Sequence, residues 1–201
     1  MLLKILNEQH SLRIFNNRKM LLTSNGFENP HISLIFLNMI KIDPQNIKIL
    51  FIPVAAEVDK ESREILPECI NELLRMGILE SNIDIRNDIE NITYIEIINK
   101  YNCIYMAGGD ENHLINRINN SGFRNELLRA INNGIFYIGV SAGTCICTPY
   151  VSNSLNIIPN STDVHCEKDV TPDGLLPINK NINLSAKQAI LINGNDIRII
   201  S

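Results

Sequence analysis

The chain has 201 residues, of which 45% are hydrophobic and 20% charged, and this fits one globular domain with a full core. A formal net charge of -4 without a basic block argues against a nucleic-acid-binding surface. Membrane insertion is not expected either, since no apolar run reaches the roughly 18 residues that a membrane span needs.

The first residues and the cysteines indicate where the protein works. Residues 1–19 mix charged side chains with short apolar pairs and lack the unbroken apolar stretch of a secretory signal. We expect them to form a leading extension, with a helix as one alternative, before a single domain over residues 20–201. The five cysteines are odd in number and show no C-x-x-C spacing. They are interpreted as reduced thiols, which predicts a cytoplasmic location.

The first half of the chain alternates apolar runs with helical patterns. Strands are predicted over residues 20–23, 46–56 and 82–86, and helices over residues 31–40, 60–76 and 92–100. The middle of the second of these strands is apolar throughout, which is typical of a strand covered on both faces. The long helix that follows it carries an apolar stripe opposed by charged side chains, formed by Ile65, Cys69, Leu73 and Met76.

The alternation continues through the second half. Strands are predicted over residues 102–107 and 137–140, helices over residues 111–119 and 123–132, short strands over residues 155–158 and 181–184, and a final hairpin over residues 189–200. Strands that alternate with helices imply right-handed crossovers and a parallel sheet. The sequence therefore predicts an α/β fold, with a three-layer, doubly wound, mostly parallel sheet of the flavodoxin-like type.

The run from Tyr137 to Thr144 joins an apolar strand to a G-x-S-x-G turn that a helix can follow. This pattern is typical of a nucleophile elbow, in which small residues allow the tight turn that lifts a serine out of its surroundings. Ser141 is the candidate nucleophile, flanked by Gly139 and Gly143. The alternative is a strand end with two glycines and a buried serine, and the pattern alone does not decide between them.

A serine nucleophile needs a base within hydrogen-bond reach. Of the four histidines, only His165 follows the elbow, in a turn-rich stretch. Loops after the carboxyl ends of strands converge on one rim of a doubly wound sheet, so His165 is the candidate base. A structural role for this histidine is the alternative.

The reaction also needs donors for the developing oxyanion. The amide of Ala142, directly after the serine, is one candidate, and the glycine pair Gly108 and Gly109 after a neighbouring strand can supply another. A glycine amide can approach a substrate carbonyl without a Cβ in the way. An ordinary strand-to-helix turn is the alternative interpretation of this pair.

Three runs together resemble the S51 serine peptidases: Tyr105 to Asp110, Tyr137 to Gly143, and Leu155 to Pro159 with His165 six residues later. The resemblance begins near Met20 and extends to the C-terminus. It implies the class I glutamine amidotransferase-like fold, with serine in place of the usual cysteine nucleophile, and a dipeptidase-like serine peptidase. It also implies that Ser141 is the nucleophile, His165 the base, and Gly109 with Ala142 the oxyanion donors.

The chain departs from the family pattern at four places. Asp110 follows the glycine pair where the family has asparagine, which adds negative charge near the substrate. Asn153 and Ala186 occupy positions where the family carries acids. The stretch after His165 lacks an arginine-bearing insert and leaves Lys168 as the nearby cation for substrate binding. These departures leave specificity for Asp-X peptides open.

A histidine base is commonly oriented by a carboxylate that fixes its tautomer. Glu167 lies two residues after His165, in a His-Cys-Glu sequence, and is the hypothesis for this role. A solvated loop glutamate is the equal alternative, and Asp163 is a weaker candidate. Comparable turnover in Glu167→Gln and the unaltered chain would remove the hypothesis.

No cofactor and no metal are expected. Cys145 and Cys147 follow the elbow and are interpreted as packing residues, since the turn exposes only its central side chain. A C-x-C pair followed by the His165-Cys166 pair lacks the ligand spacing of a structural zinc site.

The leading functional prediction is a serine hydrolase that cleaves small peptides through an acyl-enzyme. A binding or regulatory protein on the same fold, with weak or no turnover, is the alternative that the missing acids favour. A glutaminase is disfavoured by serine at the elbow. A small peptide is the expected partner, and the oligomeric state is left open, with a homodimer as one alternative.

Overall fold

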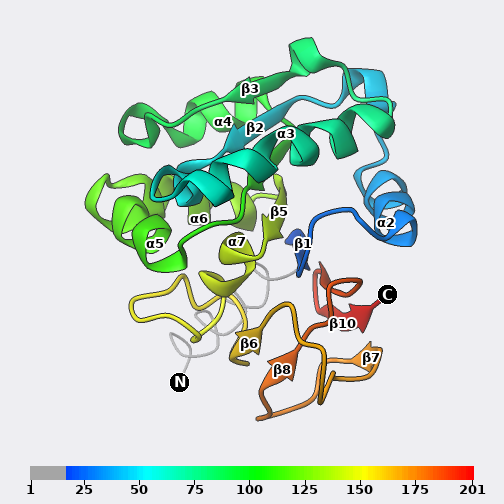
Figure 1. The fold of residues 1–201 in the computed structure, drawn as a ribbon. Coiled ribbons are helices and arrows are strands. Elements are labelled where there is room, and N and C mark those ends of the chain that lie inside the picture. Colours follow the sequence, from blue (N-terminus) through cyan, green and yellow to red (C-terminus); the bar gives the residue numbers. More distant parts are fainter. Residues whose placement is uncertain (1–16) are drawn as a thin grey trace, which may run out of the picture.

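A computed structural model describes residues 17–201 (Figure 1). The expected helix in the leading extension falls largely on residues 1–16, which lie outside the described part. Of the residues expected in that extension, Lys19 instead begins the first strand. Within the described part, no helix is long and apolar enough to cross a membrane.

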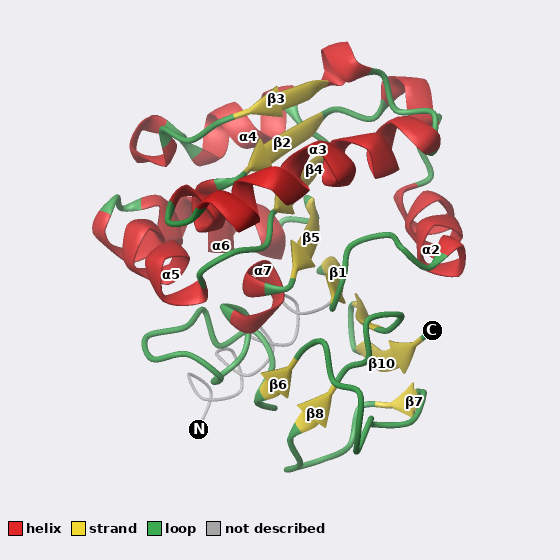
Figure 2. Cartoon of the chain, viewed as in Figure 1, coloured by secondary structure: helices red, strands yellow, loops and turns green. Residues whose placement is uncertain are grey.

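The centre of the fold is an eight-stranded sheet with the order β3-β2-β4-β5-β1-β9-β10-β7 (Figure 2). The strands from β3 to β1 in this order pair in parallel, whereas β9, β10 and β7 pair antiparallel at one side. A separate parallel pair joins β6 to β8. The strands are β1 Lys19–Thr23, β2 Ile49–Ile52, β3 Ile83–Ile85, β4 Cys103–Met106, β5 Phe136–Val140, β6 Thr162–Asp163, β7 Gly174–Leu175, β8 Ile182–Asn183, β9 Ala189–Asn193 and β10 Asp196–Ile200.

Helices cover both faces of the sheet, as the alternating pattern predicts. They are α2 Pro30–Ile40, α3 Lys60–Arg75, α4 Tyr94–Lys100, α5 Glu111–Asn120, α6 Phe123–Asn132 and α7 Ala142–Cys145, with short 3₁₀ turns η1 Pro44–Asn46, η2 Val54–Glu57, η3 Glu80–Asn82 and η4 Ile89–Asn91. In β2, Leu50 and Ile52 pack in the core with α4, α5 and α6, while Ile49 and Phe51 pack in the core with α2 and α3. Alternate side chains of one strand thus enter two cores, which explains the continuous apolar run.

Two predicted strands differ from the structure. The strand expected over residues 46–56 ends at Ile52, because Pro53 has no N–H for the ladder and the chain turns into η2. Residues 155–158 form no strand. Their backbone N–H groups instead bond to carbonyls just after the elbow, from Leu155 to Ile146 at 2.7 Å and from Ile157 to Cys147 at 2.7 Å. The predicted final hairpin is confirmed as β9 and β10.

The three strands that matter for the site are neighbours in the middle of the sheet. β5 lies between β4 and β1, and both pair with it in parallel. Their carboxyl ends therefore open at the same edge, where β4 leads to Gly108, β5 to Ser141 and β1 to Ser24. A doubly wound sheet binds ligands at such an edge, so the topology brings these loops together.

Candidate active site

Ser141 occupies a strained turn between β5 and α7. Its φ is 49° and its ψ is -105°, a backbone conformation that non-glycine residues rarely adopt. The turn is held on both sides: the Ser141 N–H donates to the Thr23 carbonyl at 3.1 Å, and the Ser141 carbonyl accepts from the Thr144 N–H at 2.8 Å. Strain that the surrounding structure holds in place is typical of functional sites.

The two glycines of the turn are required by close backbone contacts. A Cβ on Gly139 would lie 2.5 Å from the carbonyl oxygen of Gly143, and a Cβ on Gly143 would lie 2.4 Å from the carbonyl oxygen of Met106. Both distances are far below van der Waals contact, and the atoms met are backbone atoms that cannot rotate away. The G-x-S-x-G spacing is thus a steric requirement of this turn.

Two side chains that sequence reasoning missed hold the elbow, Thr144 by a contact with β1 and Tyr137 by a contact within the elbow itself. The Thr144 hydroxyl lies 2.7 Å from the Thr23 carbonyl and 2.9 Å from the Gly139 carbonyl. The Tyr137 hydroxyl donates to the Gly143 carbonyl at 2.8 Å. These groups are buried, and hydrogen bonds in the low-dielectric interior are stronger, so they fix the turn.

His165 lies against Ser141. Its Nε2 atom is 3.0 Å from the Ser141 Oγ, which is the reach expected for a nucleophile and its base. The histidine backbone has a φ of 59°, and its N–H donates to the Ser24 Oγ at 2.8 Å. Ser24 is fully buried at the end of β1, and the adjacent Cys166 N–H donates to the Leu184 carbonyl after β8 at 2.9 Å. The histidine is therefore positioned by segments that lie far apart in the sequence.

The glycine loop after β4 approaches the same serine. A Cβ on Gly108 would lie 3.2 Å from the Ser141 Cβ, and Gly109 has a φ of 136° with its Cβ position 2.2 Å from the Ala55 carbonyl oxygen. The amides of Gly109 and Ala142 donate no hydrogen bond within the described residues. They are free to serve as donors to a ligand bound at Ser141.

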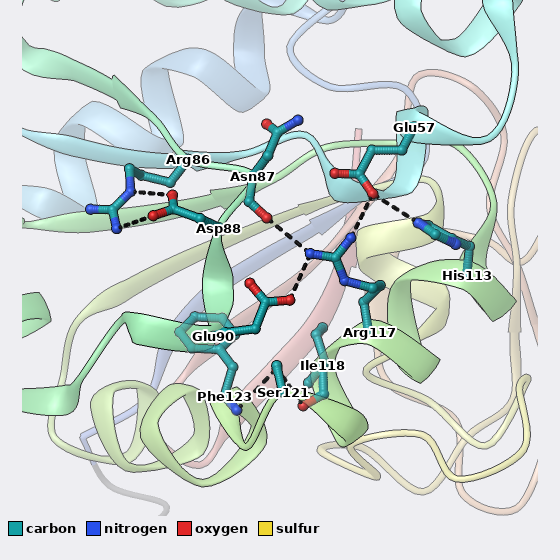
Figure 3. A network of polar contacts seen from close by, with 10 residues as sticks. All are labelled: Glu57, Arg86, Asn87, Asp88, Glu90, His113, Arg117, Ile118, Ser121 and Phe123. Atoms are coloured by element: carbon teal, nitrogen blue, oxygen red, sulfur yellow. Dashed lines mark hydrogen bonds and ion pairs between the residues drawn. The ribbon is translucent and has the colours of Figure 1, made fainter.

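A polar network connects η2 with α5, the helix that follows the glycine loop (Figure 3). The Glu57 carboxylate lies 3.0 Å from the His113 Nε2 atom and 2.9 Å from the Arg117 Nη1 atom. These contacts join η2 to α5, and the carbonyl of Ala55 in η2 also accepts the Asp110 N–H at 2.9 Å. The network thereby fixes the two segments between which Gly109 is held.

Three residues expected near the substrate or the base make no hydrogen bond with Ser141 or His165 in the structure. The Asp110 carboxylate caps α5 by accepting the His113 N–H at 2.7 Å. Glu167 and Lys168 are exposed and form no hydrogen bond or ion pair with another described residue. Within residues 17–201, the His165 Nε2 contact to Ser141 is therefore not accompanied by a carboxylate on the other ring nitrogen.

The residues at the two departures from the family's acids also form no hydrogen bond with His165. Asn153 has a φ of 59°, and its carbonyl accepts hydrogen bonds from Asn119 and Arg124. Ala186 lies in the turn before β9.

A cavity of about 350 Å³ opens beside the serine, and both Ser141 and His165 line it. The cavity is also lined by Ser62, Ile65, Leu66, Glu68, Cys69 and Glu72 of α3, and the turn after β1 adds Asn25, Gly26 and Glu28. Ile65 was expected in the buried stripe of α3, but it is 59% exposed. Its side chain borders the cavity, so apolar periodicity alone could not distinguish core from site.

The cysteines near the elbow are not alternative nucleophiles in this geometry. Burial raises the pKa of both Cys145 and Cys147 to about 12. Since the thiolate is the reactive form, these buried thiols are inert at neutral pH. All five cysteines are free thiols, and the described part of the chain contains no cluster of side chains suited to hold a metal ion.

The fold and the site together define an α/β protein with a mostly parallel sheet and a Ser-His pair at the carboxyl edge of its central strands. The family model described as peptidase family S51 matches residues 20–167. The chain therefore belongs to the peptidase S51 family, which confirms the resemblance read from the sequence.

Individual relatives agree with this assignment. The chain is 24% identical to peptidase E of Streptomyces coelicolor over 107 residues, which is 53% of this chain and 40% of that relative. The match thus spans about two-fifths of the length of this curated relative. The fold is similar to the crystal structure of a Listeria monocytogenes protein assigned as a peptidase E, with a TM-score of 0.68 and 22% identity over 91% of this chain and 98% of that chain. A peptidase from an acI-B1 actinobacterium has a TM-score of 0.66 and 20% identity over 93% of this chain and 90% of that chain.

Proposed function

We propose that this protein is a serine-type peptidase that cleaves small peptides through an acyl-enzyme. Membership in the S51 family supports a peptidase, and the 3.0 Å contact between the Ser141 Oγ and the His165 Nε2 is the observation that carries the mechanism. The contact lies at a strained turn on the wall of a cavity, where a peptide carbonyl can approach the hydroxyl.

The proposed reaction has two steps. In the first, the Ser141 Oγ attacks the peptide carbonyl carbon while the His165 Nε2 takes the hydroxyl proton. The amides of Gly109 and Ala142 stabilise the oxyanion, and the C–N bond then breaks as His165 gives its proton to the leaving amine. In the second step, His165 activates a water that attacks the acyl carbon, and the Ser141 Oγ leaves with a proton.

The site would work as a Ser-His pair. In serine hydrolases with a third member, a carboxylate holds the imidazole tautomer and stabilises the imidazolium. Here the backbone contact to Ser24 takes over the positioning, at 2.8 Å. Glu167 stays a hypothesis for the electrostatic part, and it requires a turn of its exposed side chain towards the His165 ring.

A peptide panel tests this proposal. Purified protein is incubated with dipeptides and tripeptides of varied side-chain charge, and new amino termini are quantified. We expect hydrolysis that disappears in Ser141→Ala and falls strongly in His165→Gln, while Cys145→Ala keeps most of the activity. Hydrolysis that persists in Ser141→Ala would refute the assigned nucleophile.

The second candidate is a binding protein with little turnover, and the lack of a carboxylate at His165 within the described residues favours it. It predicts that peptides bind to the folded protein and are recovered intact.

A cytoplasmic location is also proposed, supported by five free thiols.

A further inference from the structure

The segment that carries His165 is held by two backbone hydrogen bonds. The His165 N–H donates to the Ser24 Oγ at 2.8 Å, and the next N–H, of Cys166, donates to the Leu184 carbonyl at 2.9 Å. His165 itself has a φ of 59°, which residues with a side chain rarely adopt. The surrounding contacts must therefore hold this conformation, and with it the place of the imidazole.

Both of these anchors lead to one residue, Gln188, directly before β9. Its carbonyl accepts the Ser24 N–H at 3.1 Å. Its side-chain Oε1 atom accepts the N–H of Ser185, the residue after Leu184, at 3.0 Å. Gln188 thus contacts the first anchor through its backbone and the neighbour of the second through its side chain.

The other end of the Gln188 amide holds the loop that follows His165. Its Nε2 atom donates to the Thr171 carbonyl at 3.0 Å and to the Asp173 Oδ1 at 2.8 Å. Two acceptors face the nitrogen and an N–H faces the oxygen, so only one orientation of the amide satisfies all three partners. Gln188 is buried, and a buried amide with all its hydrogen bonds made fixes the segments that it joins.

Gln188 is also joined to the central sheet. The next residue, Ala189, pairs with Thr23 in the register of β9 and β1, and β1 in turn pairs with β5, the strand that leads to Ser141. Residues 166–173, in contrast, form no helix or strand. The amide therefore connects a loop without regular structure to the sheet that carries the nucleophile.

We propose that Gln188 is a positioning residue for His165: its side-chain amide holds the loop of the base so that the Nε2 atom lies 3.0 Å from the Ser141 Oγ. Gln188 touches no reacting atom and acts through Ser24 and Leu184. The inference rests on the proposed function and extends it to the support of the base.

Gln188→Met tests the inference, because methionine keeps the length of the side chain and makes none of the three amide hydrogen bonds. We expect kcat on the best peptide to fall about tenfold or more with KM nearly unchanged, since a displaced base slows proton transfer without removing substrate contacts. Asn102→Ala is the control. It removes the acceptor of the Lys48 N–H, at 2.8 Å, just before β4 and at the sheet edge opposite to Ser141. It should lower the melting temperature and keep its kcat.

Amide hydrogen exchange of His165 and Cys166 measures the positioning without any turnover. Gln188→Met should speed the exchange of both N–H groups by roughly tenfold, because the loss of the amide bonds favours local opening of the loop. Asn102→Ala should leave these two rates unchanged and speed exchange in β4 instead. A purely structural role of Gln188 would lower the melting temperature of Gln188→Met without a loss of kcat.

Asp173→Leu keeps the inference testable if Gln188→Met does not fold. Asp173 is exposed, and this change removes one of the three partners of the amide. It should speed exchange at His165 and lower kcat, each several-fold.

A reversed pair identifies the contact itself. Gln188→Glu sets a carboxylate against the Asp173 carboxylate and should lower kcat at least as much as Gln188→Met does. Asp173→Asn in the same chain supplies an N–H to that carboxylate and should restore part of the lost kcat, a coupling that independent sites do not show.

The outcomes separate this inference from the peptidase. Exchange at His165 that stays unchanged in every folded variant of Gln188 and Asp173, or a kcat loss no larger in Gln188→Met than in Asn102→Ala, would overturn the inference. Faster exchange with no hydrolysis of any peptide by the unaltered protein would refute the peptidase and support the role of Gln188 in holding His165. Hydrolysis that requires Ser141 but keeps its kcat in Gln188→Met would do the reverse.

Discussion

The Ser24 hydroxyl tests how His165 is held in place. Ser24→Ala removes the acceptor of the His165 N–H, a 2.8 Å hydrogen bond from a fully buried side chain. The loss of one hydrogen bond lowers the free energy of unfolding by about 1 kcal/mol. Here the loss should be at the low end of that range, because His165 is exposed and its freed N–H can bond to water instead. The thermal stability should therefore change little.

The catalytic effect should be larger than the effect on stability. His165 has a φ of 59°, and without its backbone contact this turn can relax and move the Nε2 atom away from the 3.0 Å contact with Ser141. A misplacement of about 1 Å can reduce turnover by roughly 10²-fold. We expect kcat to fall between roughly tenfold and 10²-fold with KM nearly unchanged.

The assay compares Ser24→Ala with Ser121→Ala, in kcat on the best peptide and in melting temperature. Ser121 also accepts a backbone N–H, from Phe123 at 3.2 Å, but in the turn between α5 and α6 (Figure 3). This control should lose comparable stability and keep its kcat. Equal kcat losses in both variants, or none in Ser24→Ala, would refute the positioning argument.

Three further predictions concern the site's supports and charges. Gly109→Ala should destabilise the protein by about 3 kcal/mol or more, visible in urea unfolding, because its Cβ would lie 2.2 Å from the Ala55 carbonyl oxygen and its φ is 136°. Arg117→Met breaks the ion pairs with Glu57 and Glu90 and should lower kcat several-fold by loosening the glycine loop. Glu72→Gln should leave stability unchanged near pH 4 and raise it relative to the unaltered protein as pH increases to neutrality, measured by urea unfolding at several pH values. The sign follows from the raised pKa of Glu72, because the folded state then favours the protonated carboxyl group. This group stabilises the folded protein at low pH. Its stabilising contribution is lost as pH rises from about 4, the pKa in the unfolded chain, through the higher pKa in the folded protein.

Each of these has a contradicting result. A stable, fully active Gly109→Ala protein would contradict the close contact with η2. Unchanged kcat in Arg117→Met would show that the network does not reach the glycine loop. A Glu72→Gln protein that is less stable at neutral pH than at pH 4, relative to the unaltered chain, would contradict the direction of the pKa shift.

Much of the fold could be predicted because the local patterns agree with the tertiary structure. The final hairpin and the alternation of parallel strands with helices followed from periodicity and turn residues. The strand predicted at residues 155–158 failed because short apolar runs carry no period that distinguishes a strand from a buried loop. Asn156, with a φ of 50°, marks the loop conformation there.

The site residues could be predicted only where a short sequence motif by itself determines the local backbone geometry. The glycines around Ser141 specify a turn, and His165 was the one histidine after that turn. Ser24 and Glu72 were missed because their relation to the site depends on the pairing of β1 with β5 and on the packing of α3. The prediction for Glu167 rested on its proximity in sequence to His165, and in the structure this exposed side chain forms no hydrogen bond with the imidazole.

The most direct test of the central claim is the site of covalent labelling by a fluorophosphonate probe, which reacts with activated serine hydroxyls. The protein, Ser141→Ala and His165→Gln are treated with the probe, and the adduct is located by peptide mass spectrometry. The account predicts one adduct on Ser141, slowed strongly in His165→Gln and absent in Ser141→Ala. A folded protein that takes up no label, or labels at another serine, would contradict it.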